Sequence, residues 1–277
     1  MRLGGPIFEK FDSPESWVSA VRGAGYRAAY CPVGPDADDD AVNAYAEAAD
    51  NADIVIAEVG AWSNPLSPDS DKAEAALAKC KAALALADRI GARCCVNIAG
   101  SCGETWDGPD AANLTGTTFD RIVAVVREII DAVKPMRSFY TLETMPWMYP
   151  DSPDAYRRLV TAIDRQAFAV HLDPVNLVCS PQRYFSNRYL IEACFEKLGE
   201  HIKSCHAKDI LLHDSLTVHL DEVSPGRGNL DYKAFLRGLN RLDSSIPLML
   251  EHLHGEEEYR RAAAHIRSVA SREEITL

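Results

Sequence analysis

The run AFAVHLD, residues 167–173, is apolar for most of its length and ends on an acid. A strand that is buried on both faces, as in a parallel sheet covered by helices, has this nearly continuous apolar composition. Three other runs share the pattern and carry an acid or an imidazole near their ends: SFYTLET (138–144), IKSCHAK (202–208) and IPLMLEH (246–252). These four runs predict parallel strands that carry polar side chains at their carboxyl ends.

Four earlier runs are similar: LGGPIF (3–8), AAYCPV (28–33), DIVIAEV (53–59) and ARCCVNIA (92–99). Between the runs, apolar residues recur at helical spacing, as from Phe119 to Val133, and helix starts are predicted at Pro14 and Pro153, each after a serine. Eight strand and helix units predict an α/β fold, a (β/α)8 TIM barrel, with residues 1–277 as a single domain. A doubly wound sheet is the alternative, but no GxGxxG motif follows the first run.

The composition indicates the cellular compartment of the protein and the classes of partner that it is expected to bind. The chain has 277 residues and a net charge of −12, with no cluster of lysine and arginine, so nucleic acid is not an expected partner. Its eight cysteines form no CxxC pair and are expected to be reduced. The first residues do not resemble a signal peptide, and no apolar run approaches the roughly 18 residues of a membrane span. We therefore expect a cytoplasmic protein that does not bind membranes, and a homo-oligomer is compatible with these features.

Four polar side chains at the ends of the last strands predict a metal site. Glu143 and Asp173 are 30 residues apart, Asp173 and His206 are 33 apart, and His206 and Glu251 are 45 apart, so each step is one strand and helix unit. Alone, each would more often be a loop residue or a helix cap. Together they converge on the carboxyl-terminal mouth of a barrel, and three carboxylates with one imidazole suit one hard or borderline divalent ion. The two glutamates could also transfer protons.

These residues resemble those of a known family. The sequence is similar, over nearly its whole length, to the xylose-isomerase-like TIM-barrel superfamily, in the sugar phosphate isomerase/epimerase branch that includes tagatose 3-epimerase, hydroxypyruvate isomerase and inosose dehydratase. The resemblance implies that Glu143, Asp173, His206 and Glu251 bind one divalent ion per chain, most often manganese, with cobalt, magnesium or zinc as alternatives. It also implies that Glu143 and Glu251 are the catalytic acid and base on opposite faces of a small carbohydrate substrate.

Further positions are candidates for substrate binding. Lys208 in HAKD and Arg227 in PGRGNLD (225–231) match the family less sharply, and Arg227 is equally compatible with a solvated loop. Trp62 and Trp106 fit either a wall that stacks on a sugar or plain loop packing. Asn176 stands where epimerase relatives usually have a substrate-binding histidine, which weakens the case for a simple ketohexose 3-epimerase.

Two more residues, Glu58 and His252, flank the predicted site, and His171 is interpreted as a packed structural histidine.

The resulting functional hypothesis is a metal-dependent sugar isomerase or epimerase. It would act on a keto sugar or related polyol ketone by carboxylate-mediated proton transfer through a metal-stabilised enediolate. The alternative is a metal-dependent lyase or dehydratase of a 3-keto sugar, 3-keto glycoside or inosose. A nuclease of the endonuclease IV kind needs more histidines than this chain offers, since none precedes His171. A sugar-binding protein without catalysis would rarely carry four converging ligands.

Overall fold

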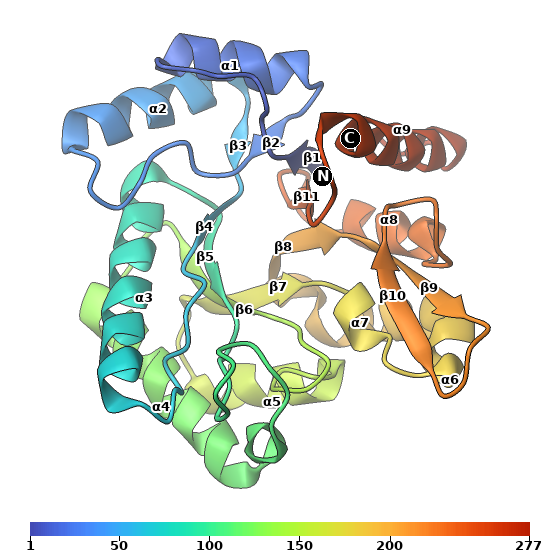
Figure 1. Ribbon diagram of the computed structural model, residues 1–277. Helices are drawn as coiled ribbons and strands as arrows, with labels where there is room; N and C mark the ends of the chain where they lie inside the picture. The colour runs from blue at the N-terminus through green and yellow to red at the C-terminus, as the bar shows by residue number, and fades with distance from the viewer.

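A sheet of parallel strands forms the centre of the computed structural model, which describes residues 1–277 (Figure 1). The strands are β1 (Arg2–Gly5), β2 (Ala28–Ala29), β3 (Val55–Ile56), β4 (Glu58–Gly60), β5 (Cys94–Asn97), β6 (Phe139–Glu143), β7 (Phe168–Leu172), β8 (Ile202–Ala207) and β11 (Pro247–Leu250). Their order is β3-β2-β1-β11-β8-β7-β6-β5-β4, and every neighbouring pair is parallel.

The two ends of this order are parts of one run of chain, because β3 and β4 are separated only by Ala57. The Ala57 amide donates to the Ala29 carbonyl at 2.8 Å on the β2 side. The Ala57 carbonyl accepts from the Cys94 amide at 3.2 Å on the β5 side. The sheet therefore closes through this residue, and the nine segments make eight barrel positions. The predicted (β/α)8 barrel is confirmed.

Helices cover the outside of the sheet (Figure 1). They are α1 (Pro14–Gly23), α2 (Asp39–Ala52), α3 (Ser70–Ile90), α4 (Gly116–Val133), α5 (Pro153–Ile163), α6 (Pro181–Phe185), α7 (Asn187–Leu198), α8 (Tyr232–Asn240) and α9 (Glu256–Arg272), with short 3-10 turns at Ala111–Leu114, Val175–Leu177 and Gly199–His201. Ser13 and Ser152 cap α1 and α5, whose first residues are prolines, as predicted. None of these helices is long and apolar enough to cross a membrane.

The strands are rich in apolar residues because both of their faces are covered. Every residue of β5 and β7 is buried. Most of the core is one cluster of 61 buried residues, and Ala28, Ala57 and Met249 form a separate small cluster. Several strands are shorter than the runs that predicted them. The run 3–8 leaves the sheet at Gly5, just before Pro6, and the run 28–33 leaves it before Pro32. Proline has no amide hydrogen to donate to a neighbouring strand.

The segment between β8 and α8 contains a β-hairpin. Strands β9 (Asp209–His213) and β10 (His219–Val223) pair in antiparallel register, with Val223 opposite Asp209. This pair forms a separate two-stranded sheet beside α6 (Figure 1). The hairpin places Glu222 near the mouth of the barrel, and this contributes to the site described below.

Candidate metal centre

The four predicted ligands meet at the carboxyl-terminal mouth of the barrel. Glu143 is the last residue of β6, Asp173 directly follows β7, His206 is next to last in β8, and Glu251 directly follows β11. One ligand atom of each lies within 4.8 Å of the corresponding atoms of the others. The register between β11 and β8 pairs Met249 with His206, so Glu251 lies close to the level of His206 at the barrel mouth.

Hydrogen bonds from the backbone orient the Asp173 carboxylate. The Val175 amide donates to Oδ1 at 2.9 Å, and the Asn176 amide lies 3.4 Å from the same oxygen. The Thr144 hydroxyl, at the end of β6, bonds both to the Asp173 amide and to its carbonyl, at 3.0 and 2.6 Å. These contacts leave Oδ2 as the oxygen that faces the centre.

Two buried carboxylate oxygens of the cluster, Asp173 Oδ2 and Glu251 Oε1, are compensated by cationic side chains, Lys208 for both and His206 for Glu251. Three carboxylates and one imidazole are donors that manganese, magnesium, cobalt and zinc all accept. This buried donor set fits a divalent ion.

A lysine stands among the same carboxylates. Lys208 Nζ lies 2.5 Å from Glu251 Oε1, 2.9 Å from Asp173 Oδ2 and 3.6 Å from Glu143 Oε1. The residue is only 2% exposed. Burial opposes its charge, but the neighbouring carboxylates, Asp173 first, outweigh that effect and raise its pKa well above the usual range. Lys208 is therefore a fixed positive charge within the centre.

The four ligands have different proton affinities. Burial acts to raise the pKa of Glu143, but His206 and Lys208 outweigh it and lower that pKa to about 2. Burial raises the pKa of Asp173 to about 7, with Lys208 opposing and Glu143 adding to the shift. Burial acts to lower the pKa of His206, but Glu251, Glu58 and Glu143 raise it well above its ordinary value. Near neutral pH Glu143 is therefore charged and His206 carries an extra proton.

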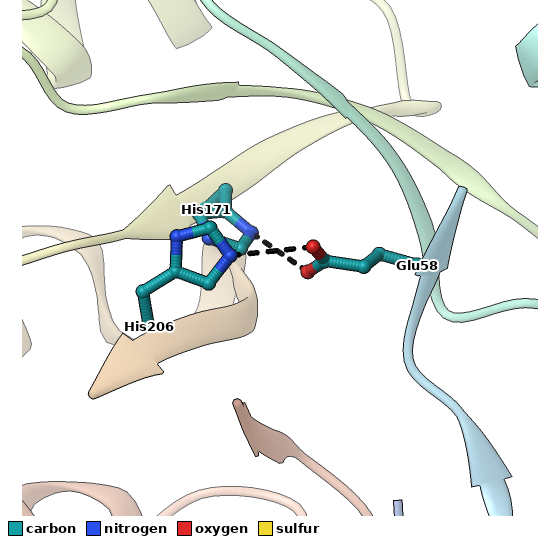
Figure 2. Close-up of side chains that lie close together, drawn as sticks. All are labelled: Glu58, His171 and His206. Carbon is teal, nitrogen blue, oxygen red and sulfur yellow. Dashed lines mark hydrogen bonds and ion pairs between the residues drawn. The ribbon is translucent and has the colours of Figure 1, made fainter. Parts of the chain in front are cut away.

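The imidazole of His206 contacts carboxylates through both ring nitrogens. Nδ1 lies 2.8 Å from Glu251 Oε1 and 3.2 Å from Glu143 Oε1, whereas Nε2 lies 3.2 Å from Glu58 Oε1. Glu58 comes from β4 and reaches His206 and His171 across the barrel (Figure 2). An acid at the end of the run DIVIAEV was the sequence signal for this residue, which flanks the site as expected.

Above the ligands lies a cavity of about 500 Å³. Its lining includes Trp62, Trp106 and Trp147, and the Trp147 indole donates to the Asp107 carbonyl at 2.7 Å, which ties two loops together. Glu222 of β10 reaches the rim, where its carboxylate lies 3.0 Å from His252 Nδ1 and 3.4 Å from Lys208 Nζ. The cavity gives a small molecule access to the ligands.

The predicted substrate-binding residues are distributed unevenly. The cavity is lined by four of them, Asn176, Lys208, Trp62 and Trp106. The side-chain amide of Asn176 donates to Glu143 Oε1 at 3.1 Å. The Trp62 ring centroid lies 6.4 Å from that of His206. Arg227 is exposed and does not line the cavity. The carbohydrate contact of all five residues stays a prediction.

Comparison with known proteins gives the same architecture. Residues 18–269 match the family described as xylose isomerase-like TIM barrel. No protein of curated function matches the sequence. A D-psicose 3-epimerase from Clostridium cellulolyticum H10 is 16% identical with a TM-score of 0.68, over 97% of this chain and 99% of that one.

Two further solved structures have the same barrel. A probable 3-DHS dehydratase from Bacillus anthracis is 14% identical with a TM-score of 0.71, over 97% of this chain and 98% of that one. Endonuclease IV from Thermus thermophilus is 15% identical with a TM-score of 0.69, over 98% of this chain and 100% of that one. These identities are too low to transfer an activity, since one barrel fold supports many reactions.

Proposed function

Because the chain belongs to the xylose isomerase-like TIM barrel family, we propose that it is a divalent-metal-dependent isomerase or epimerase of a keto sugar or related polyol ketone. The observation that carries the proposal is the convergence of Glu143, Asp173, His206 and Glu251 beneath a cavity of about 500 Å³. Two of its three carboxylates, those of Glu143 and Glu251, come from β6 and from the end of β11, with two strands between them in the sheet.

The four side chains would hold one divalent ion, for which manganese is the first candidate. A bound divalent ion supplies Lewis acidity, which makes a proton beside a carbonyl easier to remove. The chain's own groups supply the rest of the chemistry. A low pKa keeps the Glu143 carboxylate ionised, and Glu251 has its pKa lowered in the same way, mainly by His206 against the effect of burial. Both are therefore ionised near neutral pH, as a proton acceptor has to be.

Proton transfer can then proceed between the two glutamates. One carboxylate takes the proton from the carbon next to the carbonyl, and the electron pair passes to the carbonyl oxygen to give an enediolate. Return of a proton from the opposite face gives an epimer, and its return to the neighbouring carbon gives an aldose and ketose pair. The Asn176 amide, 3.1 Å from Glu143 Oε1, holds that carboxylate in place.

The cavity lining supports an uncharged carbohydrate substrate. Lys208 is the one lysine or arginine among the lining residues, and it is already paired with carboxylates. Five carboxylates line the same cavity, those of Glu58, Asp107, Glu143, Glu222 and Glu251. This excess of negative charge disfavours a phosphate group, whereas the tryptophan rings offer flat apolar faces on which a sugar ring can stack.

Incubation in heavy water tests the proposal. The protein, loaded with Mn²⁺, is incubated with a panel of keto sugars, inososes and 3-keto glycosides, and the products are examined by NMR and mass spectrometry. We expect an isomer that carries deuterium and is otherwise unchanged in mass, and no reaction after chelation of the metal. Absence of both exchange and product across the panel would contradict the proposal.

A lyase or dehydratase is the second candidate, and the observation that favours it is Asn176. An amide cannot carry a proton charge near neutral pH, unlike the histidine usual at this position in epimerase relatives. Elimination starts with the same proton removal but expels a leaving group and forms an unsaturated ketone. Release of water or an aglycone, with new near-ultraviolet absorbance and no isomer, would assign the protein to this class.

A further inference from the structure

We infer that Glu58 is a positioning residue of the metal centre, which fixes the tautomer and orientation of His206. This inference rests on the proposed metal site and adds a residue outside its ligand set. A neutral imidazole has one N–H and one lone pair. In His206, Nδ1 faces Glu143 and Glu251, while Nε2 faces Glu58 Oε1 at 3.2 Å. Only a proton on Nε2 leaves Nδ1 free as a ligand, and Glu58 is the acceptor placed to hold that proton.

Glu58 is itself held firmly. The residue is 2% exposed, and it begins β4, directly after the break at Ala57. Its second oxygen, Oε2, accepts from the Ser204 hydroxyl at 3.3 Å and lies 3.7 Å from His171 Nδ1. Ser204 and His206 belong to the same strand, β8, so the carboxylate is attached to that strand at two points. A buried carboxylate with these partners can fix the direction of an imidazole ring.

His171 supports the same ring from the side. Its ring centroid lies 4.0 Å from that of His206, at an interplanar angle of 70°, and the residue is fully buried. Neither of its ring nitrogens makes a hydrogen bond, and its contact with Glu58 in Figure 2 is the longer one of 3.7 Å. His171 therefore blocks rotation of His206 by packing, and the hydrogen bond that selects the tautomer comes from Glu58.

The group Glu58, His171 and His206 could also be considered a second metal site, since one atom of each lies within 4.8 Å of the others. That assignment requires His206 to bind one ion through each nitrogen and so to lose both ring protons. A carboxylate that accepts the Nε2 proton needs no such loss, and second carboxylates of this kind are common partners of metal-bound histidines. The geometry favours one ion with Glu58 behind its histidine.

The inference is tested by metal affinity and by the tautomer of His206. In Glu58→Leu, Mn²⁺ binding followed by the EPR signal of free Mn²⁺ should weaken roughly 10- to 100-fold. Glu58→Gln, which is nearly isosteric, should weaken it less because its amide oxygen still accepts the proton. The matched control is Glu74→Gln, since Glu74 is exposed on α3 and lines no part of the cavity. Because its charge is solvated and screened, the control should change the affinity by no more than about threefold.

NMR of the protein labelled with ¹⁵N-histidine measures the tautomer of His206, which would not change if Glu58 only supported the fold. With Mg²⁺ bound, wild-type His206 should have its proton on Nε2, and Glu58→Leu should show a mixture of tautomers while circular dichroism stays unchanged. Unchanged affinity and tautomer in Glu58→Leu would overturn the inference and leave the metal centre standing. Two ions per wild-type chain would overturn it by making Glu58 a ligand. If the wild type bound no Mn²⁺, the metal centre itself would fail.

Discussion

The Lys208 ammonium lies 2.9 Å from Asp173 Oδ2, and neither residue is more than 2% exposed. The two charges compensate each other in a part of the barrel mouth where water cannot. The same ammonium is 2.5 Å from Glu251 Oε1. A divalent ion on these oxygens would compete with Lys208 for them and would compensate the same carboxylates.

Replacement of Lys208 by methionine should therefore destabilise the metal-free protein most. Loss of one partner from a buried ion pair typically costs about 3–5 kcal/mol, and added Mn²⁺ should recover much of it. Urea unfolding with chelator and with Mn²⁺ measures both effects. Lys72→Met is the control, because Lys72 is 77% exposed and should cost less than about 1 kcal/mol. Equal stability of the two variants without metal would contradict this account.

Glu143→Gln and Glu251→Gln should each lower the rate of deuterium exchange into the substrate by about 10²- to 10⁴-fold. Each change removes a proton acceptor and a ligand charge while it keeps the shape of the side chain. Metal content and circular dichroism should be recorded alongside the rate. Glu74→Gln, at an exposed position of α3, serves as the control and should leave the rate unchanged. Near-normal rates in both glutamine variants would show that other groups move the proton.

Metal affinity should rise with pH. In the metal-free protein the pKa of Asp173 is raised to about 7 by burial, and the carboxylates around His206 raise its pKa despite burial. Both groups must lose a proton to act as ligands, so binding releases protons and weakens as pH falls below about 7. Calorimetric titration with Mn²⁺ in two buffers of different ionisation enthalpy measures this release. An affinity that stayed constant between about pH 6 and 8 would be inconsistent with these pKa values.

One divalent ion should bind per chain, because His206 belongs to both clusters of possible ligands and Glu58 accepts from its second nitrogen. Elemental analysis after dialysis against Mn²⁺ measures the ratio. Since only the folded chain presents the site, Mn²⁺ at about 100 times its dissociation constant should stabilise the protein by about 2.7 kcal/mol, and chelation should reverse this. A ratio near three would instead indicate a multi-metal cluster.

Tyr156→Phe should destabilise the barrel although it removes only a hydroxyl group. The Tyr156 hydroxyl is buried between β6 and β7, where it contacts the Leu142 carbonyl at 2.5 Å and the His171 amide at 3.2 Å. Loss of the hydroxyl leaves buried backbone groups without partners, at a cost of about 1–3 kcal/mol. Thermal or urea unfolding measures the change. Tyr189→Phe is the matched control, because Tyr189 is 71% exposed and should have almost no effect.

The sequence by itself determined the barrel and predicted which four polar side chains meet at its mouth. Runs such as AFAVHLD are mostly apolar because parallel strands are covered on both faces, and this burial can be recognised from the local amino-acid composition. The carboxyl ends of parallel barrel strands share one mouth, so Glu143, Asp173, His206 and Glu251 had to meet once the strands were recognised. Local capping chemistry likewise predicted the helix starts at Pro14 and Pro153.

Only the tertiary structure decided which other groups touch those ligands. Glu58 is 148 residues from His206 in sequence and reaches it across the barrel, and Lys208 points inward among the carboxylates, whereas Arg227 stays exposed. The hairpin that carries Glu222 to the rim is likewise a feature of the folded chain. Contacts across a barrel depend on the tilt and register of strands and on how their side chains pack, which are properties of the closed sheet and of no single segment.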